Sequence, residues 1–236
     1  MNNAHKQMRD WLRQIINKFK YVSTLNDQLE KFDDWRTPKK LTIINMGAGF
    51  FWLMNYSFMR SILIELYLLL ADREVRSLPN WLKDACRYAG NINPTRDISD
   101  GEREREVISS DEYRIIVGKN LDLLAEHSEL IGKIQIRRDK ILAHWDKKYF
   151  NNPNKIDLDS PLSKVQLKKL INSISDILRD QCVFLLEYDP CDFIVSEGPD
   201  LEVIMKHMSA KRAFKQYLAL EAKKQVVAAR REGRDI

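Results

Sequence analysis

The segment from Arg137 to Lys148, RRDKILAHWDKK, holds the side chains of this chain that are best suited to chemistry. It places two guanidinium groups, the carboxylate of Asp139 and the imidazole of His144 within about two helical turns. Arginine binds phosphate through two parallel hydrogen bonds and stabilises developing negative charge, and histidine transfers protons near neutral pH. Together these residue types favour chemistry on a phosphodiester.

The spacing of these residues supports the same interpretation but does not establish it. At about 100° per residue, an α-helix would carry Arg137 and His144 on one face, with Arg138 about a third of a turn away. The alternative is a solvent-exposed row of ion pairs, with the His144 imidazole hydrogen-bonded in the core. Charged runs on helices usually serve solubility, which favours this alternative. Spacing alone leaves both interpretations open.

Motifs of other chemistries are absent from the sequence. It has no glycine-rich phosphate loop, no HExxH, no GxSxG and no CxxC. The four histidines are too widely spaced to suggest a metal site, and the three cysteines are typical of reduced, buried thiols in a cytoplasmic protein. We therefore expect a cytoplasmic protein with no metal and no cofactor.

The net positive charge of the chain comes from its last 36 residues. Lys and Arg number 39 against 34 Asp and Glu, which gives a net charge of +5. Residues 1–200 contain as many acidic as basic side chains, and residues 201–236 contain nine basic and four acidic ones. A generally basic surface is therefore excluded. The distribution is compatible with three interpretations of the C-terminal segment: an arm that binds RNA, a solvated helix, or a helix that docks on a partner.

The elements that must position the motif are predicted to be helices, because glycine and proline are scarce and apolar residues recur every three or four positions. The pattern predicts an amphipathic helix from Met8 to Tyr21. Ser23 or Thr24 is expected to cap a second helix, which ends at Thr37–Pro38. The predicted apolar face of that second helix consists of Leu25, Leu29, Phe32 and Trp35.

The middle of the chain is predicted to contain the central helix of the bundle. That helix is expected to be the longest, to run from about Ala48 to Arg76 and to be stopped by Leu78–Pro79. A short helix from Trp81 to Tyr88 follows, and residues 89–105 are predicted to form an exposed loop because they are rich in Gly, Asn, Pro and Asp.

Ser109 or Ser110 is predicted to cap the next helix, with Glu112 in its first turn. That helix either continues or breaks near Gly132 before a motif helix over Ile134 to Tyr149. A turn is expected at Asn151–Asn154.

The last part of the helical domain is predicted to be one helix from Ser160–Pro161 to about Leu186, ended by Asp189–Pro190. Gly198–Asp200 marks the best boundary in the chain. The sequence thus predicts an all-α helical bundle over residues 1–198, followed by a basic C-terminal helix over 199–236.

One apolar stretch is long enough to need a membrane test. Residues 41–59 carry no charge, but the stretch contains polar residues and glycines, and Arg60 and Glu65 interrupt the apolar run that follows. We expect a buried core helix and not a membrane span.

The string RRDKILAHWDKKYF, set in an all-helical chain, resembles a known family. RDKILAH is similar to the R-x(4–6)-H signature of the HEPN superfamily, and the longer string is similar to its abortive-infection U-type (AbiU-like) subfamily. The apolar segment Phe50 to Asp72 resembles the helix that precedes the motif in that subfamily. The resemblance covers about residues 25–190.

This resemblance implies a helical bundle that dimerises so that two motifs meet in a shared cleft, with metal-independent ribonuclease activity in active members. Arg138 matches the motif arginine, Asp139 the polar residue after it, and His144 the motif histidine. Arg137 also satisfies the spacing, so the choice between the two arginines stays open. The expected RNA-binding residues are Arg137, Lys140, Lys147 and Lys148.

The implied reaction is attack of an RNA 2′-hydroxyl on the adjacent phosphate, which leaves a 2′,3′-cyclic phosphate. His144 would be the general base or acid, Arg138 would stabilise the phosphorane, and Asp139 would orient one of them. We therefore expect a homodimeric endoribonuclease that acts as the effector of an anti-phage or toxin–antitoxin system, with a possible antitoxin protein as partner. The alternatives are a non-catalytic RNA- or protein-binding module and a structural dimer whose motif is a buried polar network.

Overall fold

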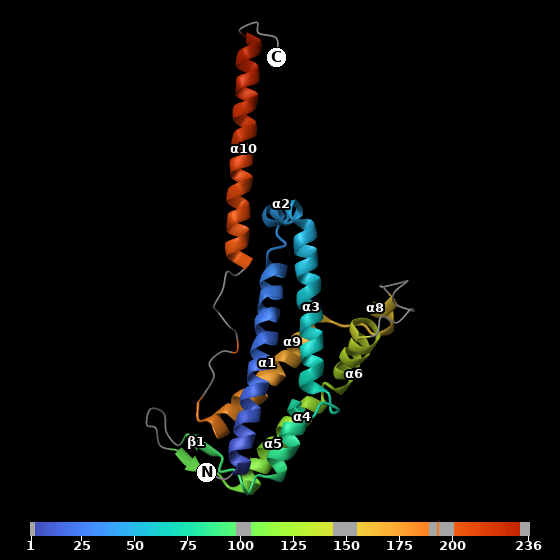
Figure 1. Ribbon diagram of the computed structural model, residues 1–236, viewed down its shortest axis with the longest axis vertical. Coiled ribbons are helices and arrows are strands. Elements are labelled where there is room, and N and C mark those ends of the chain that lie inside the picture. The colour runs from blue at the N-terminus through green and yellow to red at the C-terminus, as the bar shows by residue number, and fades with distance from the viewer. Residues whose placement is uncertain (1–2, 98–104, 144–154, 189–192, 194–200, 232–236) are drawn as a thin grey trace. The chain divides into compact units, whose positions relative to one another are not determined.

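A computed structural model describes residues 3–97, 105–143, 155–188, 193 and 201–231. It confirms the predicted all-α class, since one short hairpin is the only β-structure in these ranges (Figure 1). The elements, in chain order, are α1 Asn3–Asp34, α2 Pro38–Met46, α3 Ala48–Leu70, α4 Leu78–Arg87, β1 Thr95–Asp97, β2 Arg105–Val107, α5 Ser110–Ala125, α6 Ser128–Arg137, the π-helix η1 Arg138–Ala143, α8 Lys155–Asp159, α9 Lys164–Gln181, the π-helix η2 Cys182–Leu186, and α10 Leu201–Arg231.

The chain forms two compact units. The first combines Met1–Asn26 with Ser57–Val195, and the second combines Asp27–Tyr56 with Ser196–Ile236. The helices α1 and α3 each contribute to both units. The boundary predicted at residue 198 lies outside the described residues and stays a prediction, whereas the predicted C-terminal helix is present as α10.

The core of the first unit is built from the apolar stripes that the sequence predicts. A helix buries one face when apolar residues recur at intervals of three and four, and both α1 and α9 follow this rule. Among their fully or almost fully buried side chains are Leu12, Ile15, Ile16, Phe19, Leu170, Ile174, Ile177 and Leu178. Two hydrogen bonds join buried side chains of this core across elements: Trp81 Nε1 donates to the Met8 carbonyl at 3.0 Å, and the Tyr113 hydroxyl donates to Gln181 Oε1 at 2.7 Å.

The predicted break at Ser23–Thr24 is wrong, because α1 is one continuous helix. The Thr24 hydroxyl donates to the Lys20 carbonyl at 2.8 Å, four residues back, which a threonine inside a helix can do without capping a new one. The four residues predicted as the apolar face of a second helix are buried, so the stripe is correct. The predicted start is wrong, and the helix ends at Asp34, before Trp35 and the predicted end at Thr37–Pro38.

The prediction for the central helix is wrong at its end and in its rank. Helix α3 ends at Leu70 and is shorter than α1 and α10, and Leu78–Pro79 opens α4 instead of stopping α3. Proline suits the first turn of a helix because the amide it lacks would have no partner there. The turn between α3 and α4 is held by the Asn80 side chain, whose amide donates to the carbonyls of Asp72 and Glu74 at 2.9 Å each.

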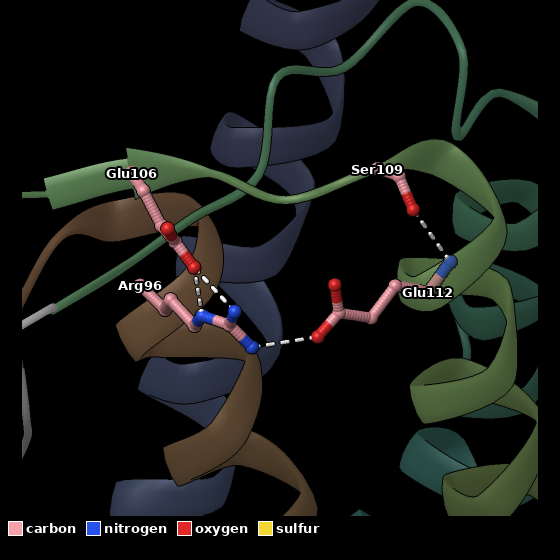
Figure 2. Close-up of polar contacts among 4 residues, drawn as sticks. All are labelled: Arg96, Glu106, Ser109 and Glu112. Carbon is pink, nitrogen blue, oxygen red and sulfur yellow. Dashed lines mark hydrogen bonds and ion pairs between the residues drawn. The ribbon is translucent and has the colours of Figure 1, made fainter.

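The segment predicted as a loop over 89–105 contains part of the hairpin. Strand β1 pairs antiparallel with β2, with Arg96 opposite Glu106. Arg96 forms ion pairs with Glu106 and, at 2.6 Å, with Glu112 of α5, and Figure 2 shows both carboxylates converging on its guanidinium. Arg105 of β2 also donates to the Val183 carbonyl of η2. Polar contacts therefore join the hairpin to both α5 and η2.

Helix α5 begins as predicted. Ser109 occupies the N-cap position of α5, and its hydroxyl oxygen accepts a hydrogen bond from the Glu112 amide at 3.1 Å (Figure 2). The break before α6 lies at Glu126–His127 and not near Gly132. Helix α9 begins at Lys164 and not at Ser160–Pro161.

The apolar helix α3 is the one described helix that is long and apolar enough to cross a membrane, judged by length and composition only. Its second half is buried in the first unit, where Ile62, Leu66 and Leu69 are fully covered. This burial agrees with the expected core helix only beyond residue 59, because most of residues 41–59 are exposed or half-buried. In its first half Phe50, Trp52 and Leu53 are more than half exposed.

The cap of α5 gives a prediction for the stability of the fold. Replacing Ser109 by alanine leaves the Glu112 amide without its acceptor and is expected to lower the free energy of unfolding by about 1 kcal/mol. Urea denaturation followed by circular dichroism measures this loss. Ser110→Ala is the matched control and is expected to change stability by about 0.5 kcal/mol or less, since Ser110 is the first helical residue and not the cap. Equal losses in the two variants would contradict the assignment.

Candidate active site

The residues predicted to do chemistry lie at the junction of α6 and η1. Arg137 ends α6, and Arg138, Asp139 and Lys140 form the first half of η1. His144, Lys147 and Lys148 lie outside the described residues. The structure thus places the two arginines and the aspartate next to one another, and it does not describe the histidine.

The helix changes its hydrogen-bond pattern at this junction. Residues 138–143 form a π-helix, a pattern in which amides bond to carbonyls five residues back and not four, although the Arg138 amide at its start still bonds to the carbonyls of Ile134 and Gln135. The turn is therefore wider, and the 100° spacing expected for an α-helix does not hold through residues 138–143. The predicted helix over Ile134 to Tyr149 is, as far as it is described, α6 followed by η1. Short π-segments inside helices are frequent at functional sites.

The side chain of Arg137 is engaged in holding the fold. Its Nε donates to the Ser160 carbonyl at 2.8 Å, and its Nη2 donates to Asp157 Oδ1 at 2.7 Å. These two nitrogens form the edge of the guanidinium that binds a carboxylate or phosphate side-on. Only 14% of the side chain is exposed, and Ser160 is buried. Arg137 therefore ties α6 to α8 and the turn after it.

Arg138 has the opposite arrangement. Its Nη1 donates to Asp139 Oδ1 at 2.8 Å, and this hydrogen bond raises the pKa of the guanidinium. Its Cζ lies 4.4 Å from the centre of the Tyr67 ring, on α3. Within the described part of the chain, Nε and Nη2 have no hydrogen-bond partner, and 31% of the side chain is exposed. The edge that Arg137 uses internally is therefore unpaired in Arg138 as far as the chain is described, and we refer to it as the open edge.

Three of the contacts at this junction come from residues that the sequence does not point to. Asp157 and Ser160 bind Arg137 from about twenty residues further along the chain, and Tyr67 lies under Arg138 from about seventy residues earlier. Tyr67 lies within the apolar segment Phe50 to Asp72 that resembles the family helix, but nothing local marks it as a partner of an arginine.

No metal centre is found where the structure gives side chains. In that part of the chain no three His, Cys, Asp or Glu side chains lie close enough to hold a metal ion. The chemistry available from the described groups is therefore anion binding at Arg138, beside the carboxylate of Asp139. Lys140 is exposed at the same junction and adds positive charge.

Comparison with known proteins identifies the family. The HEPN AbiU2 family pattern matches residues 8–185, which is most of the chain and includes most of α1 and all of α3, α6 and η1. The chain belongs to the AbiU2 family of HEPN proteins. This membership confirms the predicted family and the HEPN-like helical bundle. No curated protein and no solved structure shows significant similarity to this chain.

The different environments of the two arginines give a prediction. Arg137→Ala leaves the buried Ser160 carbonyl without its donor and is expected to lower the free energy of unfolding by about 1–3 kcal/mol. Arg138→Ala is the matched control and is expected to cost about 1 kcal/mol or less, because its ion pair and ring contact are partly exposed. Urea denaturation compares the two. A larger loss for Arg138→Ala would show that these structural roles are reversed.

Proposed function

We propose that this AbiU2-family protein is a metal-independent endoribonuclease that cuts RNA by attack of a 2′-hydroxyl on the adjacent phosphate. Family membership supports a role of HEPN type. The observation that carries the finer proposal is the open Nε–Nη2 edge of Arg138, held beside Asp139 and six residues before His144. An arginine edge of this kind can bind a phosphate by donating two parallel hydrogen bonds to its oxygens.

In the proposed reaction, Arg138 binds the two non-bridging oxygens of the scissile phosphate. The 2′-oxygen forms a bond to phosphorus, its proton passes to a histidine acting as base, and the bond from phosphorus to the 5′-oxygen breaks. That oxygen leaves with a proton supplied by an acid. The products are a 2′,3′-cyclic phosphate and a free 5′-hydroxyl. His144 is the proposed base or acid, and Asp139 keeps Arg138 in orientation.

The assembly and the biological setting belong to the same proposal. One motif supplies one histidine, whereas the reaction needs both a base and an acid, so a homodimer in which two motifs share a cleft would provide the pair. We place the enzyme in the cytoplasm as the toxic effector of an anti-phage or toxin–antitoxin system, with an antitoxin protein as a further partner. Lys140, Lys147 and Lys148 are proposed to bind the RNA backbone beside Arg138, whereas Arg137 is proposed to act through the fold.

A second function, a non-catalytic RNA-binding module, is favoured by one separate observation. Helix α10 carries eight basic and two acidic residues. On it Lys206, Lys211 and Lys215 are exposed, and the aromatic side chains of Phe214 and Tyr217 are about 60% exposed. Lysines bind phosphates and aromatic rings stack on bases, so α10 alone could hold single-stranded RNA. Such a module would bind RNA without cutting it.

Incubation of the purified protein with RNA in EDTA tests the proposed reaction. The wild type is expected to cleave, and to leave DNA of the same sequence intact because DNA lacks the nucleophile. His144→Ala is expected to lower the rate by about 10²–10⁴-fold, as for loss of a general acid or base, and Arg138→Ala by about 10²–10³-fold, as for loss of a charge-stabilising donor.

Matched controls are Arg13→Ala, which removes an exposed arginine paired with an aspartate three residues away, and His207→Ala, which removes an exposed histidine. Both controls are expected to cut RNA at nearly the wild-type rate. Intact RNA after incubation with the wild type, together with retained RNA affinity, would select the binding module. Cleavage by His144→Ala at the wild-type rate would refute the proposed chemistry.

A further inference from the structure

The aromatic ring of Tyr67 lies against the guanidinium of Arg138. Tyr67 belongs to the second half of α3, where its neighbours Leu63, Leu66 and Leu70 are buried, and Tyr67 itself is only 7% exposed. The distance of 4.4 Å from the Arg138 Cζ to the ring centre is well within the range of a cation–π contact. The buried ring of Tyr67 therefore packs against the guanidinium of Arg138, which is partly exposed.

Two restraints act on the same guanidinium from different directions. The Tyr67 ring restrains the guanidinium group through the cation–π contact, and the hydrogen bond from Nη1 to Asp139 restrains one end of it. An arginine side chain has several rotatable bonds and loses considerable conformational entropy when it is ordered. With the restraints already in place, part of that entropy is lost before a ligand binds, and Nε and Nη2 are left for a phosphate.

We infer that Tyr67 is a positioning residue of this site, which holds the guanidinium of Arg138 so that its Nε–Nη2 edge meets the scissile phosphate in the orientation that the phosphorane requires. The inference rests on the proposed ribonuclease reaction. The aromatic face performs this role, and the phenolic hydroxyl is not required for it. Orientation matters more to the transition state than to initial binding, so loss of the ring lowers kcat more than it raises KM.

Three substitutions at position 67 separate the ring's electrostatics from its volume. Tyr67→Phe keeps the ring face and serves as the conservative variant. Tyr67→Leu removes the ring and keeps an apolar side chain in the core. Pentafluorophenylalanine at position 67 keeps nearly the shape of phenylalanine but reverses the charge distribution of the ring face, so it packs in the core and repels a cation.

Cleavage of an RNA oligonucleotide by these variants gives kcat and KM separately. Tyr67→Leu and the pentafluorophenylalanine protein are expected to lower kcat by roughly 2- to 30-fold with little change in KM, which corresponds to loss of a cation–π contact. Tyr67→Phe is expected to retain the wild-type kcat. In an Arg138→Ala background, the Tyr67→Leu substitution is expected to lower kcat no further, because the ring acts through the guanidinium.

The contact itself is measured without catalysis, from the ring-current shift of the Arg138 Nε–Hε NMR signal. This signal is expected at a shifted position in the wild type and in Tyr67→Phe, and at an ordinary position in Tyr67→Leu. The shift present together with RNA left uncut by the wild type would refute the ribonuclease and leave the contact standing. An unshifted signal in the wild type would refute the contact.

Two outcomes would overturn the positioning role while the ribonuclease stands. One is an unchanged kcat in the pentafluorophenylalanine protein, whose core packing is preserved. The other is an equal loss of kcat in Tyr67→Phe and Tyr67→Leu, which would assign the effect to the hydroxyl. Should Tyr67→Leu not fold, as judged by circular dichroism, the pentafluorophenylalanine protein alone decides.

Discussion

The pair of hydrogen bonds from Arg137 to the Ser160 carbonyl and to Asp157 is the constraint on which the geometry of this site depends. It joins the end of α6 to α8, although these elements are separated by about twenty residues in the chain. Because it uses the Nε–Nη2 edge of Arg137, that edge is not available to an external phosphate. The next residue, Arg138, begins the π-helix and keeps the same edge open. Two adjacent arginines of equal chemistry therefore have different surroundings, and tertiary contacts set that difference.

Membership of the AbiU2 family gives this arrangement its context. The proposed reaction uses no metal. Separately, no three His, Cys, Asp or Glu side chains lie close enough to hold one among the described residues. The net charge of residues 1–200 is zero, so attraction of RNA by a generally basic surface would not explain the proposed binding at the motif. Local groups must do so, and Arg138, stacked on Tyr67 and paired with Asp139, is the one for which the structure gives an open phosphate-binding edge. The excess charge lies on α10, outside the matched region.

The features that the sequence predicts correctly are those that depend on periodic burial or local hydrogen bonds. The stripes of α1 and α9 are predictable because burial of one helical face requires the spacing seen in Phe19 or Ile174, whatever the neighbouring helix is. The cap at Ser109 is predictable because its acceptor and donor lie three residues apart. The start of α4 at Leu78–Pro79 was open to the opposite interpretation, since proline can follow a helix as well as begin one.

The features that the sequence does not predict depend on contacts between distant segments. Residues 138–143 are ordinary helix formers, so nothing local signals the π-helix. The choice between Arg137 and Arg138 depends on Ser160 and Tyr67, which reach the motif only through the fold. The hairpin pairing of Arg96 with Glu106 is likewise formed across a segment whose composition is that of a loop.

The central claim is that the open edge of Arg138, and not that of Arg137, binds the phosphate of RNA. Titration with an RNA oligonucleotide that is made uncleavable by 2′-deoxy substitution, followed through the arginine Nε–Hε NMR signals, tests this claim most directly. We expect the Arg138 signal to shift as the RNA binds, while the Arg137 signal keeps its position because its Nε already donates to the Ser160 carbonyl. A shift of the Arg137 signal with an unmoved Arg138 signal, at saturating RNA, would contradict the claim.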